Sequence, residues 1–465
     1  MSYPAPPSTE SGAAPGRGLP HDPGTALAAA NLDADRDAKR RMYRRRRIVA
    51  GTVALALVAL IASGAVYVSN ALGAPLPAVA AEITDPPPVA QAAQPLVLPG
   101  TGEFAIGAVG FDGLLATSAD QSPMAIASIA KVVTALTVLA QHPVAPGEGG
   151  PSIEYTDADV DIYWDMIAQN GSVAPVAAGT SLTLVQSLEA MLLPSGNNYA
   201  ISIANWAFGS EAAYTAAANA WLAQQGLTEI TVADASGLSM DNVGTPAALV
   251  RLGELALAEP ALAGIVSTQA VDLPGVGRVE NSNKLLGTHG VDGIKTGTTD
   301  DAANLLFSAD YQVGGSTVTV VGVALGQDTH AQLREQVAAL LDSVAPGFHE
   351  VQALAAGTPL ATYGTAWGDT TTATASEGAS VVVWSDTPVD VEVVADPITT
   401  VGAGDRVGTA TVRAGSQVIE VPLLVDAPIE DPGTWWRLTN PGGLDATQGA
   451  GSVDTGSVDS GSPAE

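Results

Sequence analysis

The sequence predicts an α/β domain followed by a small all-β domain. Helical stretches dominate from Ser128 to about Leu257, strand-like alternation returns in "STVTVVGVALG" at 316–326, and a further helix is expected near 329–343. Two apolar runs around Asp112-Gly113 indicate a hairpin just ahead of the helical region. After Pro346 the pattern changes to short β runs separated by turn residues, such as "ASVVVWS", "VDVEVVA", "GTATVRAG" and "QVIEVPLLV".

Composition limits the classes of function that the chain can serve. With 465 residues and 46% hydrophobic content, it can bury a large core and form two domains with tails. A formal net charge of -30 argues against nucleic acid as a partner, because phosphate binding needs clustered basic residues. Cysteine is absent, which excludes disulfides and cysteine metal sites.

The N-terminal region predicts a single membrane anchor. Seven positive charges in "KRRMYRRRR" (39–47) precede 21 residues without a charge at 48–68, enough for one transmembrane helix. Basic flanks stay on the cytoplasmic side, so we expect 1–47 to be a cytosolic, disordered N-terminus and the remaining chain to be extracytoplasmic. The alternative is a signal peptide cleaved near "NALGA" at 70–74, but a signal's apolar region is usually shorter, about 7 to 15 residues.

Composition also suggests domain boundaries beyond the anchor. Residues 69–95 are rich in proline and predict an extended linker, 96–345 form the main domain, and 346–430 form the β-rich domain. Residues 431–465 include a Gly/Ser-rich acidic stretch and predict a disordered tail. Nine of the 18 basic and five of the 48 acidic residues lie in 1–47, which leaves nine basic against 43 acidic residues, a net charge of -34, outside. We expect this acidic surface to be soluble.

A serine and a lysine stand one helical turn apart in "SIAKVVTAL" (128–136). The whole chain has four lysines, so Lys131 is more than background charge. At this spacing Lys131 Nζ can reach Ser128 Oγ, and an unprotonated lysine there can accept the serine proton. S-x-x-K by itself is weak evidence and needs context.

Two downstream motifs supply that context. "LLPSGNNYA" contains Ser195-Gly196-Asn197, and "VDGIKTGTTD" contains Lys295-Thr296-Gly297 on a predicted edge strand along which a substrate backbone could lie. Taken alone, S-x-N is typical of a polar helix cap or turn, and K-T-G is equally consistent with an exposed strand end.

Together, S-x-x-K, S-x-N and K-T-G in this order match the motif set of penicillin-binding serine enzymes. With the flanks "MAIASIAKVVTAL", "MLLPSGNNYA", "DASGLSMDN" and "NSNKLLGTHGVDGIKTGTTD", the chain resembles the D-alanyl-D-alanine carboxypeptidases, the low-molecular-mass penicillin-binding proteins of the peptidase S11 type. The resemblance is strong over 96–345, whereas 346–430 resembles the family's C-terminal domain only in position and pattern. It implies a transpeptidase-like α/β domain, with helices on an antiparallel sheet, followed by a β-sandwich-like domain.

The resemblance implies roles for three catalytic residues. Ser128 would attack the carbonyl between two D-alanines, Lys131 would activate it, and Ser195 would relay a proton to the leaving D-alanine. Such an enzyme trims the terminal D-alanine from peptidoglycan stem peptides through an acyl-enzyme and binds β-lactams covalently. No cofactor is implied.

The resemblance also implies the substrate-binding residues. Asn197 would orient the substrate amide and Lys131, while Lys295 and Thr296 would bind the terminal carboxylate. The backbone N–H groups of Ser128 and Thr298 would form the oxyanion hole. A neutral Lys131 requires a lowered pKa, for which burial and the charge of Lys295 are the plausible causes.

The sequence departs from the family pattern at two places. Asn198 stands where the family commonly has aspartate, and "TTDDAANLL" after K-T-G carries Asp300, Asp301 and Asn304 in place of a bulky residue and a small pair. We expect these changes at the rim of the pocket, where they alter substrate preference rather than reaction type.

Other sites receive little support from the sequence. No G-x-S-x-G elbow is present, and the five histidines show no H-E-x-x-H pattern, so no metal is expected. His289 is interpreted as a loop residue, and Trp164 and Trp435-Trp436 as packing residues rather than a sugar platform.

Three functions are compatible with the sequence: the serine-type carboxypeptidase, a β-lactamase-like hydrolase, and a catalytically weak cell-wall scaffold. No E-x-x-L-N lies between S-x-N and K-T-G to supply a deacylating glutamate, which argues against the β-lactamase. The intact motif set argues against the scaffold.

Overall fold

The computed structural model describes residues 23–87, 89 and 91–441. Contacts divide the chain into two units, one made of 1–78 with 431–465 and the other of 79–430. The outer parts of the predicted disordered ends, 1–22 and 442–465, lie outside the described residues.

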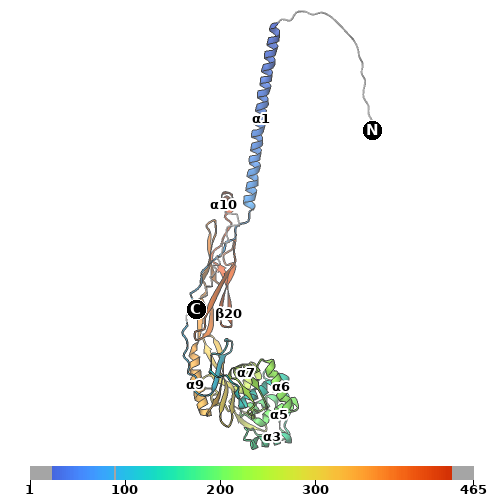
Figure 1. The fold of residues 1–465 in the computed structure, drawn as a ribbon, viewed down its shortest axis with the longest axis vertical. Helices are drawn as coiled ribbons and strands as arrows, with labels where there is room; N and C mark the ends of the chain where they lie inside the picture. The colour runs from blue at the N-terminus through green and yellow to red at the C-terminus, as the bar shows by residue number, and fades with distance from the viewer. Residues whose placement is uncertain (1–22, 88, 90, 442–465) are drawn as a thin grey trace, which may run out of the picture. The chain divides into compact units, whose positions relative to one another are not determined.

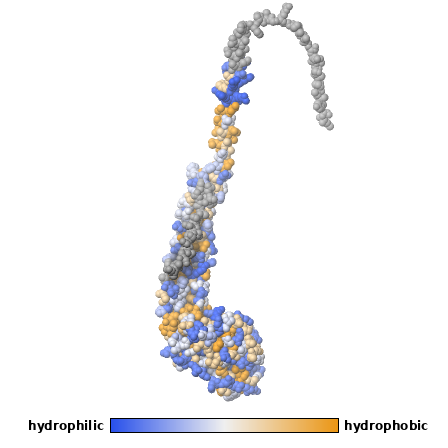
Figure 2. Space-filling view, in the orientation of Figure 1, coloured by the Kyte–Doolittle hydropathy of each residue, from blue (hydrophilic) through white to orange (hydrophobic). Residues whose placement is uncertain are grey.

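Among its described residues, the first unit contains two helices, α1 (Pro23–Gly73) and α10 (Gly433–Thr439). Between Asp35 and Gly73, α1 is long and apolar enough to cross a membrane, and its most apolar 18 residues have a mean hydropathy of 2.3 and none of them is buried. Figure 2 shows this apolar band directly after the strongly hydrophilic basic segment. Such a helix is consistent with a membrane anchor or a signal sequence. Helix α1 covers 23–47 of the N-terminus that was predicted to be disordered, and α10 covers 433–439 of the predicted disordered tail, so both predictions are corrected at these residues.

A five-stranded antiparallel sheet forms the centre of the main domain in the order β11-β12-β13-β2-β3. Its strands are β2 (Glu103–Ala108), β3 (Ala116–Thr117), β11 (Val291–Thr298), β12 (Ala303–Val313) and β13 (Ser316–Gln327). Strands β2 and β3 pair as the predicted hairpin, and β11 is an edge strand, as its sequence suggested.

Helices cover both faces of this sheet (Figure 1). Leu306 packs with the helices of one face and its neighbour Leu305 with the other, because successive strand residues point to opposite sides. On the first face, α7 (Pro246–Ala258) and α8 (Pro260–Val266) contact the sheet. The helices α2 (Ala130–Gln141), α4 (Leu184–Leu192), α5 (Asn197–Phe208) and α6 (Glu211–Gln224) share the apolar core on this side. The second face carries α9 (His330–Val344). The predicted α/β class, with helices on an antiparallel sheet, is confirmed.

Short elements connect these layers and carry the loops of the site. They are β4 (Met124–Ala125), η1 (Ala127–Ile129), β5 (Ser152–Glu154), α3 (Asp157–Ala168), β6 (Ser181–Thr183), β7 (Ile230–Thr231), β8 (Val243–Gly244), β9 (Ala270–Leu273) and β10 (Gly277–Glu280). A 3-10 turn, η2 (Ala345–Gly347), ends the region after α9.

The β-rich region has a separate apolar core and two sheets. Its strands are β1 (Glu82–Ile83), β14 (Phe348–Leu354), β15 (Pro359–Gly364), β16 (Thr370–Ala375), β17 (Ala379–Trp384), β18 (Asp390–Ala395), β19 (Arg406–Ala414) and β20 (Gln417–Val425). Six strands pair in the order β1-β15-β16-β20-β19-β18, and β14 pairs with β17.

The predicted linker at 69–95 is partly structured, which corrects the expectation of a free spacer. Strand β1 pairs with β15, and Val79 forms an isolated bridge with Ile398. Proline-rich composition predicts an extended backbone, and an extended backbone can also add an edge strand to a sheet.

Candidate active site

The predicted nucleophile lies where η1 runs into α2. Ser128 is partly exposed in η1, and Lys131 follows one turn later with none of its surface exposed. The preceding residue, Ala127, has a φ of 49°, a conformation that L residues rarely adopt. Gly237 packs against this turn so closely that a Cβ there would lie 2.0 Å from the Ala127 carbonyl oxygen. The turn that presents Ser128 is therefore held by a second loop.

Lys131 Nζ has three hydrogen-bond partners. It lies 2.9 Å from Ser128 Oγ, 2.6 Å from Asn197 Oδ1 and 2.6 Å from the Ser236 carbonyl oxygen. Burial lowers the pKa of Lys131 well below 10.5, and the charge of Lys295 lowers it further, while Asp234 acts in the opposite direction. No acidic side chain forms an ion pair with Lys131 in the part of the chain that the structure describes.

Asp234 holds the loop that supplies the Ser236 carbonyl. Its Oδ1 accepts hydrogen bonds from the backbone N–H groups of Ser236 and Gly237 at 2.7 and 2.6 Å, and its Oδ2 accepts from that of Ser239 at 2.7 Å. Asn242 Nδ2 donates to the same carboxylate at 2.8 Å. These bonds lower the pKa of Asp234 although burial opposes them, so the carboxylate is ionised at neutral pH.

The S-G-N motif lies at the start of α5, and its members differ in their contacts. Asn197 is buried and accepts the bond from Lys131, as described above. Ser195 is 7% exposed, has a φ of 66° and makes no hydrogen bond to Ser128 or Lys131 among the described residues. The structure thus brings Asn197, but not the hydroxyl of Ser195, into direct contact with Lys131.

Lys295 and Thr296 lie on the edge strand β11. Lys295 is 1% exposed, its Nζ lies 3.3 Å from Thr296 Oγ1, and burial lowers its pKa to about 7. No acidic side chain pairs with it within the described ranges. Gly297 lets β11 approach η1, because a Cβ there would lie 2.7 Å from the Ile126 carbonyl oxygen. A buried ammonium without a counter-ion is a ready binding group for an anion.

Ser282 joins this strand to a neighbouring polar loop. Its Oγ lies 2.6 Å from Thr296 Oγ1, and its N–H donates to the Leu193 carbonyl at 2.9 Å, two residues before Ser195. Ser282 therefore connects the strand of the K-T-G motif with the segment that leads into the S-G-N motif.

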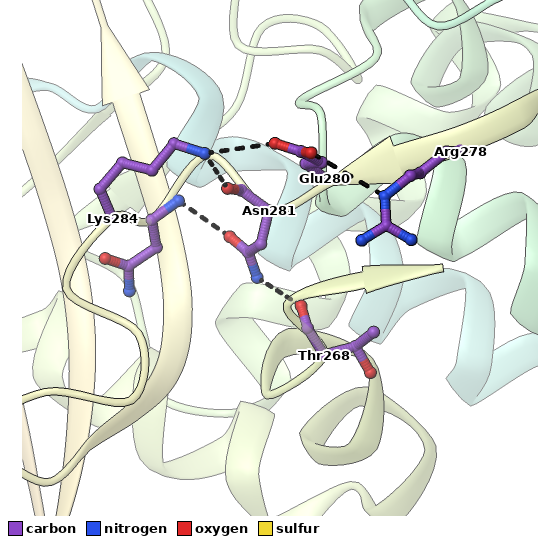
Figure 3. Close-up of polar contacts among 6 residues, drawn as sticks. Thr268, Arg278, Glu280, Asn281 and Lys284 are labelled. Atoms are coloured by element: carbon purple, nitrogen blue, oxygen red, sulfur yellow. Dashed lines mark hydrogen bonds and ion pairs between the residues drawn. The ribbon is translucent and has the colours of Figure 1, made fainter. Parts of the chain in front are cut away.

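A network of polar contacts supports the loop around Ser282 (Figure 3). Asn281 donates from Nδ2 to the Thr268 carbonyl at 3.1 Å, and its own carbonyl accepts from Lys284 Nζ at 3.2 Å. Glu280 lies between Lys284 and Arg278, at 3.8 and 3.9 Å. Lys284 is exposed, in contrast to the buried Lys131 and Lys295.

Thr298 contacts a histidine that the motif analysis did not select. Thr298 Oγ1 lies 2.7 Å from His330 Nε2 at the first residue of α9. Burial lowers the pKa of His330, and the positive charges of Arg334 and Lys295 lower it further. Neither His330 nor Ser282 belongs to a spaced motif, so only their proximity to β11 identifies them.

The predicted rim residues divide into buried and exposed positions. Asn198 is buried and bonds both the N–H and the carbonyl of Ala174, at 3.1 and 3.0 Å. Asn304 is also buried and donates to the Ala125 carbonyl. Placing these two at the rim was therefore wrong, whereas Asp300 and Asp301 are exposed.

The remaining sequence interpretations can now be compared with the structure. Trp164 is 61% exposed and Trp435 78% exposed, so interpreting them as packing residues was wrong. His289 lies between elements, with Nδ1 2.7 Å from Asp342 Oδ1. Among the described residues, no cluster of three His, Asp or Glu side chains could hold a metal ion.

The fold and this cluster define a class of enzyme. A serine within reach of a buried lysine, beside an edge strand with a second buried lysine, is an arrangement suited to acyl transfer from a serine. Residues 112–329 match the family model described as D-alanyl-D-alanine carboxypeptidase. The resemblance inferred from the motifs is confirmed for this region, which is that of a serine D-Ala-D-Ala carboxypeptidase, a hydrolase.

Solved structures also match parts of the chain. A mutant of the Streptomyces K15 DD-transpeptidase is 23% identical, with 54% of this chain and 98% of that chain covered and a TM-score of 0.47. Penicillin binding protein 5 from Haemophilus influenzae is 18% identical, with coverage of 75% and 100% and a TM-score of 0.49. The D-alanyl-D-alanine carboxypeptidase DacD from Francisella tularensis is 17% identical, with coverage of 71% and 94% and a TM-score of 0.49. No curated protein matches the chain.

Proposed function

We propose that this protein trims the terminal D-alanine from peptidoglycan stem peptides through an acyl-enzyme on Ser128, and that β-lactams acylate the same residue. One observation carries the proposal. Two of the three partners of Lys131 Nζ, Asn197 Oδ1 and the Ser236 carbonyl, can only accept hydrogen bonds. A neutral amine has two N–H groups, so these acceptors occupy both and leave its lone pair for the hydroxyl of Ser128.

Acylation begins with transfer of the Ser128 hydroxyl proton to Lys131. The serine oxygen forms a bond to the carbonyl carbon between the two D-alanines, and the carbonyl oxygen becomes an oxyanion held by the N–H groups of Ser128 and Thr298. As the tetrahedral intermediate collapses, the C–N bond breaks, and the proton on Lys131 passes to the leaving amine. A relay by Ser195 requires its hydroxyl to move into contact with Lys131, because the two are not hydrogen-bonded in this structure. The products are an ester on Ser128 and free D-alanine.

Hydrolysis of the ester restores the enzyme. Water gives one proton to Lys131 as its oxygen attacks the ester carbon, and the bond to Ser128 oxygen breaks. Lys131 then returns the proton to Ser128, and the shortened peptide leaves as a carboxylic acid that gives its proton to the solvent. No acidic side chain contacts Ser128 or Lys131 in the described part of the chain, which favours this lysine-centred cycle over a β-lactamase that deacylates with a glutamate.

The terminal carboxylate of the substrate binds at Lys295 and Thr296. The buried ammonium of Lys295 has no counter-ion among the described residues, and Thr296 Oγ1 lies next to it. A β-lactam presents a carboxylate beside a reactive acyl carbon, as the peptide does, so the same groups bind it.

The protein acts outside the cell membrane in this proposal. The apolar helix α1 supports an uncleaved anchor through 48–68, with 1–47 in the cytosol and the enzyme region on the other side. Sequencing the N-terminus of the membrane-extracted protein tests this topology. A mature chain starting near Ala74 would contradict it in favour of a signal peptide.

Fluorescent penicillin labelling and D-alanine release from a pentapeptide test the enzymatic proposal. We expect both in the wild type and neither in Ser128→Ala, because the ester can then no longer form. Ser122→Ala is the matched control, since Ser122 is exposed and bonds only to Asp120. Labelling that persists in Ser128→Ala would assign the nucleophile elsewhere, rapid drug turnover without D-alanine release would favour a β-lactamase, and neither signal in the wild type would favour the scaffold.

A further inference from the structure

We propose that α10 binds the lipid–water interface and, together with Tyr67 of α1, forms an aromatic belt at the outer end of the membrane anchor. The inference rests on the proposed topology and concerns a part of the chain outside the active site. Its partner is the headgroup region of a zwitterionic bilayer.

Two hydrogen bonds attach α10 to the end of α1. The hydroxyl of Tyr67 donates to the Leu438 carbonyl at 2.6 Å, and Arg437 Nη1 donates to the Ala74 carbonyl at 2.6 Å. These partners are 371 and 363 residues apart in the chain. In Figure 1, α10 lies beside the end of α1 that leads into the rest of the chain. Helix α10 is therefore held where the charge-free segment 48–68 ends.

The side chains at this junction are those that favour a membrane interface. Trp435 is 78% exposed, and Trp436 follows it on the same short helix. Tyrosine and tryptophan concentrate at bilayer interfaces because their rings are amphipathic. Exposed apolar residues of α1, including Val66 and Leu72, continue the apolar surface toward α10. Trp435 lies three residues from Leu438, so at 1.5 Å per residue it is within about 5 Å of the Tyr67 contact along the helix axis.

The charges at the junction favour zwitterionic rather than anionic lipid. Arg437 forms an ion pair with Asp431 at 2.5 Å, and its side chain is only 12% exposed, so its charge is compensated within the protein. The chain beyond residue 47 also carries a net charge of -34, which repels anionic lipid. Aromatic insertion, rather than attraction of opposite charges, therefore stabilises the contact.

The belt attaches both ends of residues 79–430, which contain the active site, to the membrane. Helix α1 precedes residues 79–430 and α10 follows them, so with α10 bound at the interface the segment is attached to the membrane at its two ends rather than at one.

Depth-dependent quenching of tryptophan fluorescence tests the belt. The full chain is reconstituted in phosphatidylcholine vesicles whose acyl chains carry bromine either close to the headgroups or deep in the bilayer. We expect shallow bromine to quench the wild type more than deep bromine, with most of that quenching lost in the Trp435→Phe/Trp436→Phe variant. Trp164→Phe is the matched control, since Trp164 is 61% exposed on α3 in the other unit of the chain, and its replacement should leave the quenching unchanged.

Three results would overturn the proposal: no quenching in the wild type, equal quenching in the double variant, or stronger quenching by deep than by shallow bromine. The quenching of tryptophan fluorescence does not depend on catalysis, and D-alanine release measured on the same samples shows that each variant is folded. Failure of the belt and failure of the enzymatic proposal are therefore distinguished.

Discussion

The low pKa of Lys295 predicts how recognition of the substrate carboxylate depends on pH. Burial lowers this pKa from 10.5 to about 7, a cost of about 5 kcal/mol to the charged form. Because the pKa is lowered, the ammonium is fully present only below pH 7 and is lost as the pH rises through it. In the free enzyme the charged fraction is about one half at pH 7, about one tenth at pH 8 and about one hundredth at pH 9.

We therefore expect kcat/KM for a peptide ending in D-Ala-D-Ala to fall about tenfold for each pH unit above 7. The bound carboxylate stabilises the charged form of Lys295, so kcat should begin to fall at a higher pH than kcat/KM. The measurement is the initial rate of D-alanine release, or of D-alaninamide for the control peptide, between pH 5 and 9 at low and saturating substrate.

Two controls separate Lys295 from other groups that titrate in this range. A peptide with an amidated C-terminus has no carboxylate, so its low rate should show no fall centred near pH 7. Lys284→Ala removes an exposed lysine outside the site and should leave the profile unchanged. A flat kcat/KM up to pH 9 for the free acid, or the same alkaline fall for the amide, would refute the assignment of carboxylate binding to Lys295.

Further predictions concern the groups around Ser128. Lys131→Ala should lower acylation by both peptide and penicillin at least a hundredfold, measured as the labelling rate, and an unchanged rate would exclude it as the base. Gly237→Ala should destabilise the protein by about 2 kcal/mol or more in urea unfolding, because its Cβ would clash with backbone atoms. Gly226 has a similar φ but open space around it, so Gly226→Ala should cost less, and equal losses in the two variants would contradict the clash as the cause. Asp234→Asn replaces a carboxylate that accepts several N–H bonds, so it should lower both the melting temperature and kcat, and a wild-type kcat would show that this loop does not position Lys131. His330→Ala removes the partner of Thr298 and should raise KM for the peptide more than it lowers kcat; a change in kcat alone would argue against a binding role.

Local patterns in the sequence account for most of the fold that could be predicted. Alternation in 316–326 and the helical stretches from Ser128 onward reflect periods of two and 3.6 residues, which neighbouring residues determine by themselves. The same local spacing predicted the contact between Lys131 and Ser128. Local composition was a poorer guide at 82–83 and 433–439, where a strand and a helix form against partners far along the chain.

The environment of each site residue required the tertiary structure. The sequence alone determined that the chain carries a serine, two motif lysines and an asparagine in a recognisable order, and that an apolar helix precedes them. Only the folded chain brings the Ser236 carbonyl to Lys131, Ser282 to Thr296, and His330 to Thr298. Burial of Lys131 and Lys295, and hence their lowered pKa values, depends on surrounding residues from several elements. Such long-range contacts form when apolar faces pack, and no local spacing in the chain encodes which polar groups then meet.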